Sequence, residues 1–356
     1  MRNKILVFLF SSFLLIMLLI NIFSDDKRIS YIERRTLQMF PEFSLNDILD
    51  ATFFKKFDNY TVDQFIGREK FQKIKAYFAY NILNNYDNNG LYVINNHIFK
   101  QEYPYNKNAL IKTINKINNV YNKYLKNNQV YYAIIPDKNY FVSDKYLKID
   151  YSDMFKTIKN SFDFKYIDII NELNLNDYYL TDPHIKQDSM FKLVDNLIEG
   201  MNNDYYYVSY QKDTLKEFYG SYYGQLGLSN KSDEMVYLTN NIINNAKVYY
   251  LENDKLNSVY NLSKYKGMDS YDIYLDGASS FIEIINEECL NDRELVIFRD
   301  SFGSSIAPLL IPYYSKITLI DIRYLRSDLL NNYIEFNNQD VLFLYSTLIY
   351  NTNILK

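Results

Sequence analysis

Ser301 has the residue type and the local sequence of a catalytic nucleophile. The apolar run 295–298 before it predicts a buried strand, and the helix-like spacing after Gly303 predicts a helix. A strand that ends in a small-residue turn and leads into a helix places the turn side chain at the carboxyl edge of a sheet, where open α/β proteins bind ligands. There Ser301, beside backbone N–H groups, could attack an acyl group; the alternative is that it only caps the helix.

A catalytic serine needs an imidazole base, and the chain offers only two histidines, His97 and His184. Asp182 lies two residues before His184 in a polar loop that Pro183 stiffens. Its carboxylate could accept a hydrogen bond from one imidazole nitrogen, which would leave the other nitrogen facing Ser301. His97 lies in a predicted hairpin, and we assign it to structure. The pattern favours Ser301, His184 and Asp182 as nucleophile, general base and orienting carboxylate.

Four further residues are weaker candidates for contacts with substrate or with an oxyanion: Phe302, Gly303, Arg299 and Lys138. The backbone N–H groups of Phe302 and Gly303 follow the serine and could face the oxyanion of a tetrahedral intermediate. Arg299 and Asp300 are better explained as solvated turn residues that hold the loop. Lys138 ends a neighbouring predicted strand, where it could touch substrate or lie at the surface.

The motif Asp182-Pro183-His184, followed much later by Val296-Ile297-Phe298-Arg299-Asp300-Ser301-Phe302, resembles the DHHW protein family of Gram-positive bacteria. That family is similar to the alginate O-acetyltransferases of the AlgX and AlgJ group, whose fold is SGNH-hydrolase-like. The likeness covers most of the chain after the N-terminal segment and extends to Glu33–Leu37, Phe40–Pro41, Asp58, Asp63, Phe65, Arg68, Ile135–Asn139, Gly220–Ser221, Pro308–Leu309, Tyr314 and Asp321–Tyr324. The motif departs from the family at Pro183, where relatives usually carry Thr or His, and at Ile185, where they carry Trp.

This resemblance implies an α/β fold, namely an SGNH-hydrolase-like three-layer sandwich with a mainly parallel sheet. It implies acetyl transfer onto an extracellular polysaccharide through an acyl-enzyme on Ser301, with a membrane-bound O-acyltransferase as the partner that supplies acetyl groups. No cofactor or metal is expected besides an acetyl donor. The alternatives are a carbohydrate acetyl esterase of the same fold and a non-catalytic glycan-binding protein of the cell surface. The changed Pro183 and Ile185 motivate the second alternative, whereas the retained Asp182 and His184 oppose it.

The N-terminal segment predicts where the body of the protein lies. Residues 5–23 form an almost uninterrupted apolar run of about 19 residues, enough to cross a bilayer as a helix. Arg2 and Lys4 precede it, which favours an N-terminus inside the cell and a body outside. Because the run resembles a signal peptide but lacks a small-x-small cleavage site, we expect residues 1–24 to form an uncleaved signal anchor. Residues 25–64 would then be a polar stalk and lead-in.

The remaining chain, residues 65–356, alternates helix and strand in the manner of α/β folds. Besides the strand before Ser301, the patterns predict strands at 129–135, 166–169, 317–320 and 341–345 and helices at 65–83, 108–125, 154–162 and 189–201. Residues 204–287 break this alternation with glycines and short tyrosine-rich pieces, which predicts a β-rich insertion beside the active site.

The composition excludes several other kinds of protein and site. The single cysteine, Cys289, rules out an intrachain disulfide, and no Cys/His cluster is present for a structural zinc ion. A net charge of -4 opposes nucleic acid binding, which needs a basic face. Tyrosine is abundant, with 38 residues, and tyrosines that line a groove would suit stacking against sugars.

Overall fold

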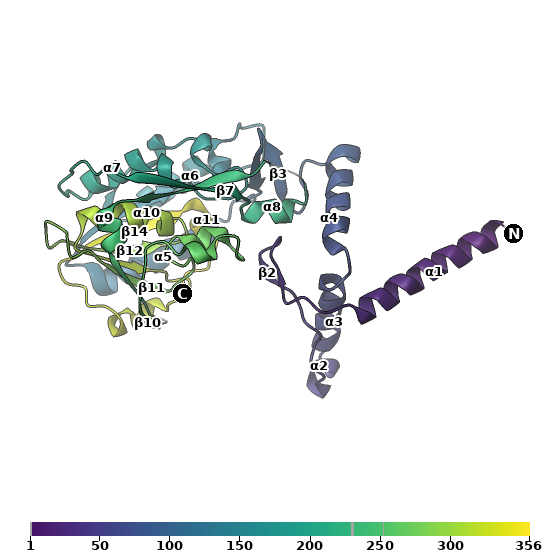
Figure 1. Ribbon diagram of the computed structural model, residues 1–356. Helices are drawn as coiled ribbons and strands as arrows, with labels where there is room; N and C mark the ends of the chain where they lie inside the picture. The colour runs from purple at the N-terminus through teal and green to yellow at the C-terminus, as the bar shows by residue number, and fades with distance from the viewer. Residues whose placement is uncertain (1, 229–230, 252) are drawn as a thin grey trace. The chain divides into compact units, whose positions relative to one another are not determined.

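The structure, a computed structural model, describes residues 2–228, 231–251 and 253–356 (Figure 1). The chain divides into two compact units, one formed by residues 1–89 with 223–229 and the other by residues 90–222 with 230–356. We call the first the N-terminal unit and the second the α/β unit.

An eight-stranded mixed sheet forms the centre of the α/β unit. In spatial order its strands are β10 (Asn253–Asn257), β9 (Lys247–Tyr250), β11 (Phe281–Ile285), β13 (Lys316–Ile320), β12 (Glu294–Arg299), β14 (Asp340–Ser346), β5 (Gln129–Ile135) and β6 (Lys165–Tyr166). The predicted parallel pairing holds from β13 through β12, β14 and β5 to β6. It does not hold for β9, β10 and β11, which pair antiparallel. Only two residues separate β9 from β10, too few for the crossover that a parallel pair requires.

Helices cover both faces of this sheet, so the α/β unit has three layers. On β12, Leu295 and Ile297 belong to one buried cluster and Val296 and Phe298 to the other, because side chains alternate along a strand. The first cluster includes α7 (Phe191–Gly200) and α10 (Gly303–Leu310), and the second includes α5 (Lys107–Val120), α6 (Tyr151–Lys159) and α11 (Thr347–Tyr350). Each fully buried aliphatic side chain contributes about 1.5–3 kcal/mol, so a slip of one residue, which would exchange the two faces, is strongly disfavoured.

Many elements of the α/β unit lie where the apolar patterns predict them. Strand β5 occupies the predicted residues, and α5 continues through a π-helical turn at Tyr121–Leu125 to its predicted end. The predicted hairpin, β3 (Leu91–Ile94) and β4 (His97–Lys100), turns at Asn95 and Asn96, whose φ angles of 49° and 66° suit a two-residue hairpin turn. Short 3-10 turns lie at Lys138–Phe141, Ile170–Glu172, Leu175–Asp177, Gln187–Ser189, Leu262–Lys264, Ser270–Ile273, Ile311–Tyr313 and Ser327–Asn332.

The segment 204–287, predicted as an insertion, divides between two sheets. Strands β7 (Gln211–Phe218) and β8 (Asp233–Thr239) form an antiparallel pair of their own. Two short helices, α8 (Ser221–Leu226) and α9 (Asn241–Asn245), belong to the same segment. Strands β9, β10 and β11 instead extend the central sheet, so this part of the segment is not an insertion. The break in the sequence pattern reflects antiparallel strands of the same sheet.

The N-terminal unit contains α1 (Arg2–Phe23), the short pair β1 (Ile29–Ser30) and β2 (Arg35–Thr36), and the helices α2 (Leu45–Leu49), α3 (Thr52–Asp63) and α4 (Arg68–Tyr77). A π-helical turn at Phe78–Ile82 continues α4. Among the described residues, the one helical stretch long and apolar enough to cross a membrane is Asn3–Phe23. The expected polar stalk is folded, since α2, α3 and the strand pair all lie within residues 25–64.

Residues that carry the family likeness in the N-terminal unit form one ion-pair network. Arg35 lies 2.7 Å from Glu33 and donates to Asp63 at 2.8 Å, and Arg68 lies 2.6 Å from Glu33. Hydrogen bonds from Arg35 hold the pKa of Asp63 below its ordinary value. Burial alone would raise the pKa of Glu33, but hydrogen bonds from Arg68, Gln72 and Arg35 outweigh it and lower the pKa. These ion pairs therefore stabilise the folded structure of the lead-in segment, residues 25–64.

Candidate active site

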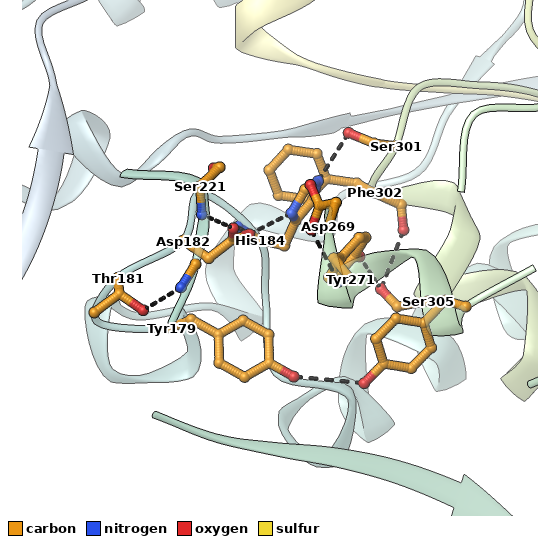
Figure 2. A network of polar contacts seen from close by, with 12 residues as sticks. Tyr179, Thr181, Asp182, His184, Ser221, Asp269, Tyr271, Ser301, Phe302 and Ser305 are labelled. Atoms are coloured by element: carbon orange, nitrogen blue, oxygen red, sulfur yellow. Dashed lines mark hydrogen bonds and ion pairs between the residues drawn. The ribbon is translucent and has the colours of Figure 1, made fainter. Parts of the chain in front are cut away.

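Asp182, His184 and Ser301 meet in one hydrogen-bonded series (Figure 2). Ser301 lies in the turn between β12 and α10, at the carboxyl end of a parallel strand. The Nε2 atom of His184 is 2.8 Å from Ser301 Oγ, and its Nδ1 atom is 2.5 Å from Asp182 Oδ1. His184 and Ser301 are 117 positions apart in the sequence, yet their polar atoms are within hydrogen-bond reach. This is the geometry in which an imidazole can take the proton of a serine hydroxyl while a carboxylate orients it.

The loop that carries Asp182 and His184 is closed on itself by backbone contacts. Tyr178 and Ile185 form an isolated antiparallel bridge, and the Tyr179 amide donates to the His184 carbonyl at 3.1 Å. Such pairing closes the loop and brings the Asp182 carboxylate to the Nδ1 edge of the imidazole. The His184 amide also donates to Asp182 Oδ1 at 3.2 Å. Contacts within the loop therefore help to fix the side chains of Asp182 and His184.

Lys138 is buried and holds the same loop through hydrogen bonds to its backbone carbonyls. It is 3% exposed, and its ammonium donates to the carbonyl oxygens of Ile98, Tyr179, Leu180 and Asp182 at 2.6, 2.9, 3.1 and 3.3 Å. Burial lowers the pKa of Lys138 to about 7, against the opposing charge of Asp182. The predicted surface position of Lys138 is therefore wrong, and its contact with substrate stays a prediction. This side chain ties the β3–β4 hairpin to the Asp182 loop.

Gly220 and Ser221 position the Asp182 carboxylate from the other side. The Ser221 amide donates to Asp182 Oδ2 at 2.7 Å (Figure 2). The Gly220 amide donates to Thr181 Oγ1 at 2.7 Å. A Cβ atom on Gly220 would lie only 2.3 Å from Asp182 Cβ and 2.4 Å from the Thr181 carbonyl oxygen. Only glycine permits this close approach. The Gly-Ser element noted in the sequence thus touches the candidate site directly.

Asp233 is a site residue that sequence reasoning missed. Its carboxylate accepts hydrogen bonds from the Leu180 amide at 2.7 Å and from the amide and hydroxyl of Thr181 at 2.9 and 2.6 Å. Burial raises the pKa of Asp233, although these hydrogen bonds oppose the rise. Asp233 lies on β8, 52 positions from Thr181, and no local pattern marks it as a partner of the Asp182 loop.

The face of the His184 ring is covered by Tyr271. The two rings are nearly parallel, with centroids 3.7 Å apart and an interplanar angle of 8°. Phe302 contacts the same imidazole at a centroid distance of 4.8 Å. The Tyr271 hydroxyl donates to Ser305 Oγ at 2.7 Å, which fixes the tyrosine to α10 (Figure 2). Ile185, the position where relatives carry Trp, is fully buried in the core, so a different residue provides the aromatic contact.

The turn around Ser301 is held by Asp300, a buried residue. Asp300 Oδ1 accepts from the Phe302 amide at 3.0 Å, and the Asp300 carbonyl accepts from the Gly303 amide at 3.1 Å. Asp300 Oδ2 accepts from the amide and the hydroxyl of Ser346 at 2.9 and 2.6 Å. The two amides expected to face an oxyanion are therefore already bonded within the turn. Asp300 itself is 1% exposed, so its assignment as a solvated turn residue is wrong.

Arg299 is buried behind the turn, and its predicted exposure is also wrong. It is 1% exposed, and its guanidinium donates to Ser304 Oγ at 3.0 Å and to the carbonyls of Gly277 and Ser279 at 3.3 and 3.2 Å. Burial lowers the pKa of Arg299. A Cβ atom on Gly303 would lie 2.7 Å from Arg299 Cβ, so glycine lets α10 start close to the end of β12. These contacts let Arg299 position the turn, and its contact with substrate stays a prediction.

His97 stays outside this hydrogen-bonded series. It is buried in the β3–β4 hairpin, with its ring 6.3 Å from Phe99, and burial lowers its pKa to about 4. Within residues 2–228, 231–251 and 253–356, no cluster of three or more His, Cys, Asp or Glu side chains could hold a metal ion. The chemistry that these residues can support is nucleophilic attack by an activated serine hydroxyl.

Solved structures share this fold. A DHHW family protein from Eubacterium siraeum matches with a TM-score of 0.60 over 76% of this chain and 98% of its own, at 20% identity. Bacillus cereus PatB1 with a sulfonyl adduct matches with a TM-score of 0.59 over 75% of this chain and 98% of its own, at 16% identity. The O-acetyltransferase domain of Pseudomonas putida AlgJ is a more distant likeness, with a TM-score of 0.46 over 74% and 92% at 11% identity. No protein-family model and no curated protein matches the sequence. The resemblance inferred from the sequence is therefore confirmed at the level of the fold, an α/β fold that this chain shares with the DHHW family protein and with PatB1.

Proposed function

We propose that this chain is a membrane-anchored O-acetyltransferase that modifies an extracellular polysaccharide through an acyl-enzyme on Ser301. The observation that carries the proposal is the hydrogen-bonded series from Asp182 through His184 to Ser301 Oγ. The fold likeness to PatB1, a structure that contains a sulfonyl adduct, supports it. The apolar α1, with its basic start, supports attachment to the membrane with the body outside.

In the first half-reaction, His184 Nε2 takes the proton of Ser301 Oγ as the oxygen attacks the acetyl carbonyl of the donor. The imidazolium that forms is stabilised by Asp182, which accepts the Nδ1 proton. When the carbonyl re-forms, the bond to the donor oxygen or sulfur breaks, and His184 gives its proton to that leaving group. The product is an acetyl ester on Ser301, and a membrane-bound O-acyltransferase is the proposed source of the donor.

In the second half-reaction, a sugar hydroxyl gives its proton to His184 Nε2 and attacks the acetyl ester. The bond to Ser301 Oγ breaks, the serine regains a proton from His184, and the sugar leaves as its O-acetyl ester. Water in place of the sugar would make the same machinery an esterase. Since the Phe302 and Gly303 amides already have acceptors, the Ser301 amide is the remaining candidate in this turn for the oxyanion.

The test uses the full chain in detergent and a sulfonyl fluoride, which an activated serine attacks at sulfur with loss of fluoride. Intact-mass measurement gives the rate of labelling, and a chromogenic acetyl ester gives the rate of turnover. Ser301→Ala should abolish labelling, and His184→Ala should slow turnover by about 10^4-fold or more. Ser143→Ala, at an exposed serine of the α/β unit, is the matched control and should behave as the unaltered chain.

The acceptor is then varied. Addition of oligosaccharides should raise the rate at which the acetyl-enzyme is discharged, and the sugar should gain the mass of an acetyl group. Discharge to acetate alone, with every acceptor, would favour the esterase over the transferase. Labelling that persists in Ser301→Ala, or no acylation of the unaltered chain by any acetyl ester, would contradict the proposed mechanism and favour a glycan-binding protein.

A further inference from the structure

One face of α4 and its π-helical continuation is apolar and largely exposed in the N-terminal unit. Phe71, Ile74, Phe78 and Ile82 recur at intervals of three and four residues, which places them on a single face of the helix. Each of these four side chains is more than half exposed. We call them the α4 stripe. The face of α4 that packs into the unit is a different one and carries small residues, with Ala76 fully buried.

Basic residues border the α4 stripe. By helical periodicity Lys70 lies on one side of the stripe and Lys75 on the other, and both are exposed. A helix with an apolar face flanked by lysines is the pattern of helices that lie in the interface of a bilayer, where the long lysine side chains reach toward the headgroups. A surface helix of a soluble body would instead turn its apolar face toward the core.

The α4 stripe starts at the end of α1. The Ile66 amide, two residues before α4, donates to Asn21 Oδ1 at 2.8 Å. A cavity of about 790 Å³ is lined both by α1 residues, among them Met17 and Ile22, and by Phe65 and Phe71. The first residue of the stripe therefore lies beside the last turns of α1. An apolar surface thus continues from the candidate membrane helix onto α4.

The length of α1 fixes the depth at which α4 begins. Its apolar stretch Asn3–Phe23 has 21 residues. At about 1.5 Å per residue this spans about 31 Å, close to the hydrocarbon thickness of a bilayer of about 30 Å. Asn21 is therefore close to one boundary of the hydrocarbon layer when α1 crosses it. The Asn21–Ile66 hydrogen bond places the start of α4 at the same boundary.

We propose that the α4 stripe is a second membrane-binding element, which lies in the lipid interface beside the crossing helix α1. An interfacial helix buries its apolar face by about 5–10 Å at the boundary of headgroups and acyl chains. The N-terminal unit then holds the membrane by two elements, one that spans it and one that lies on it. This inference rests on the proposed membrane attachment and is independent of the chemistry at Ser301.

The chain contains no tryptophan, so one introduced tryptophan reports its own surroundings. The full chain with Phe78→Trp is placed in nanodiscs of phosphatidylcholine and phosphatidylglycerol, and in matched discs whose acyl chains are brominated. We expect emission shifted to short wavelength and loss of most fluorescence in the brominated discs. Ile82→Trp, one turn further along the stripe, should behave alike. Tyr207→Trp, at a side chain 84% exposed in the α/β unit, should stay unquenched.

Three results would overturn the inference. Emission typical of water at both stripe positions, unchanged by brominated lipid, means that the stripe faces solvent. Emission at short wavelength without quenching means that the stripe is covered by protein, such as a second copy of this chain. Failure of the unaltered chain to co-elute with discs means that α1 does not insert, which also removes the membrane attachment. Acylation of Ser301 would be unaffected by this last result, so the two proposals fail separately.

Discussion

Replacement of Gly220 by alanine should slow acylation of Ser301 while leaving the α/β unit folded. The added Cβ atom would lie 2.3 Å from Asp182 Cβ and 2.4 Å from the Thr181 carbonyl oxygen, whereas ordinary contacts of this kind are 3.4–4 Å. Neither atom is the far end of a flexible side chain. The segment that carries Asp182 must therefore move by about 1 Å, and with it the carboxylate that orients His184.

The expected size of the effect follows from this displacement. A shift of about 1 Å in a catalytic constellation can cost about 10²-fold in rate. The same collision resembles overpacking of a core, which typically costs about 1–3 kcal/mol of stability. We therefore expect Gly220→Ala to be labelled by a sulfonyl fluoride about 100-fold more slowly, with a lowered but still cooperative thermal unfolding transition.

The assay compares the labelling rate at Ser301, by intact mass, with the unfolding temperature, by circular dichroism. Gly90→Ala is the matched control, because Gly90 has a φ of +73° but nothing within 4 Å of its added Cβ. It carries backbone strain of about 1–2 kcal/mol without a collision, so it should lose stability and keep the labelling rate. Equal labelling rates for Gly220→Ala and the unaltered chain would refute the role given to this contact.

Three further predictions follow from neighbouring contacts. Ser221 is the first residue of α8, where proline fits, and Ser221→Pro removes the backbone N–H that donates to Asp182. Because hydrogen bonds to charged groups contribute about 1.5–3 kcal/mol, this change should slow labelling of Ser301 at least about tenfold. Ser221→Ala keeps the backbone N–H and should leave the labelling rate unchanged. Lys138→Met removes the ammonium that donates to four carbonyl oxygens, of which the Leu180 carbonyl keeps the Ile98 amide as a donor, and should lower the free energy of unfolding by about 3 kcal/mol or more in chemical denaturation. The lowered pKa of Asp63 in the folded state adds stability that is complete above its ordinary pKa of 3.8 and is lost as the pH falls through the folded-state pKa. Asp63→Asn should therefore destabilise the N-terminal unit at pH 7 and flatten its acid transition, as measured by limited proteolysis across pH 2–7. An unchanged acid transition would mean that the ion pair with Arg35 contributes nothing to stability.

The parallel half of the fold could be predicted from the sequence because its strands are buried on both faces. Such strands appear as short continuous apolar runs, and β5, β12 and β14 each follow that pattern. The candidate nucleophile and base were also accessible, since the chain has only two histidines and Ser301 lies in a small-residue turn between a predicted strand and a predicted helix. Strands β9 to β11 were missed as members of the sheet because their antiparallel pairing leaves no alternation of helix and strand to detect.

The buried charges were not accessible from the sequence, because long-range contacts decide where they lie. Lys138 and Arg299 each occur at the end of a strand, where a charged residue normally faces solvent. Backbone carbonyl oxygens from distant segments accept their hydrogen bonds and make burial tolerable. The same is true of Asp233, which bonds a loop 52 positions away. The local sequence pattern identifies such a residue as charged, but it does not predict that the residue is buried.

The two departures from the family motif, Pro183 and Ile185, would affect catalysis directly if their side chains contacted the imidazole of His184. Ile185 lies wholly in the core, and the ring that covers His184 comes from Tyr271 in a distant segment. The imidazole is held at Nδ1 by Asp182, on its face by Tyr271 and at Nε2 by Ser301. None of these contacts uses the side chain of residue 183 or 185. The direct contacts that orient the base are therefore kept despite both departures, which supports the proposed acyl transfer over a catalytically silent glycan-binding protein.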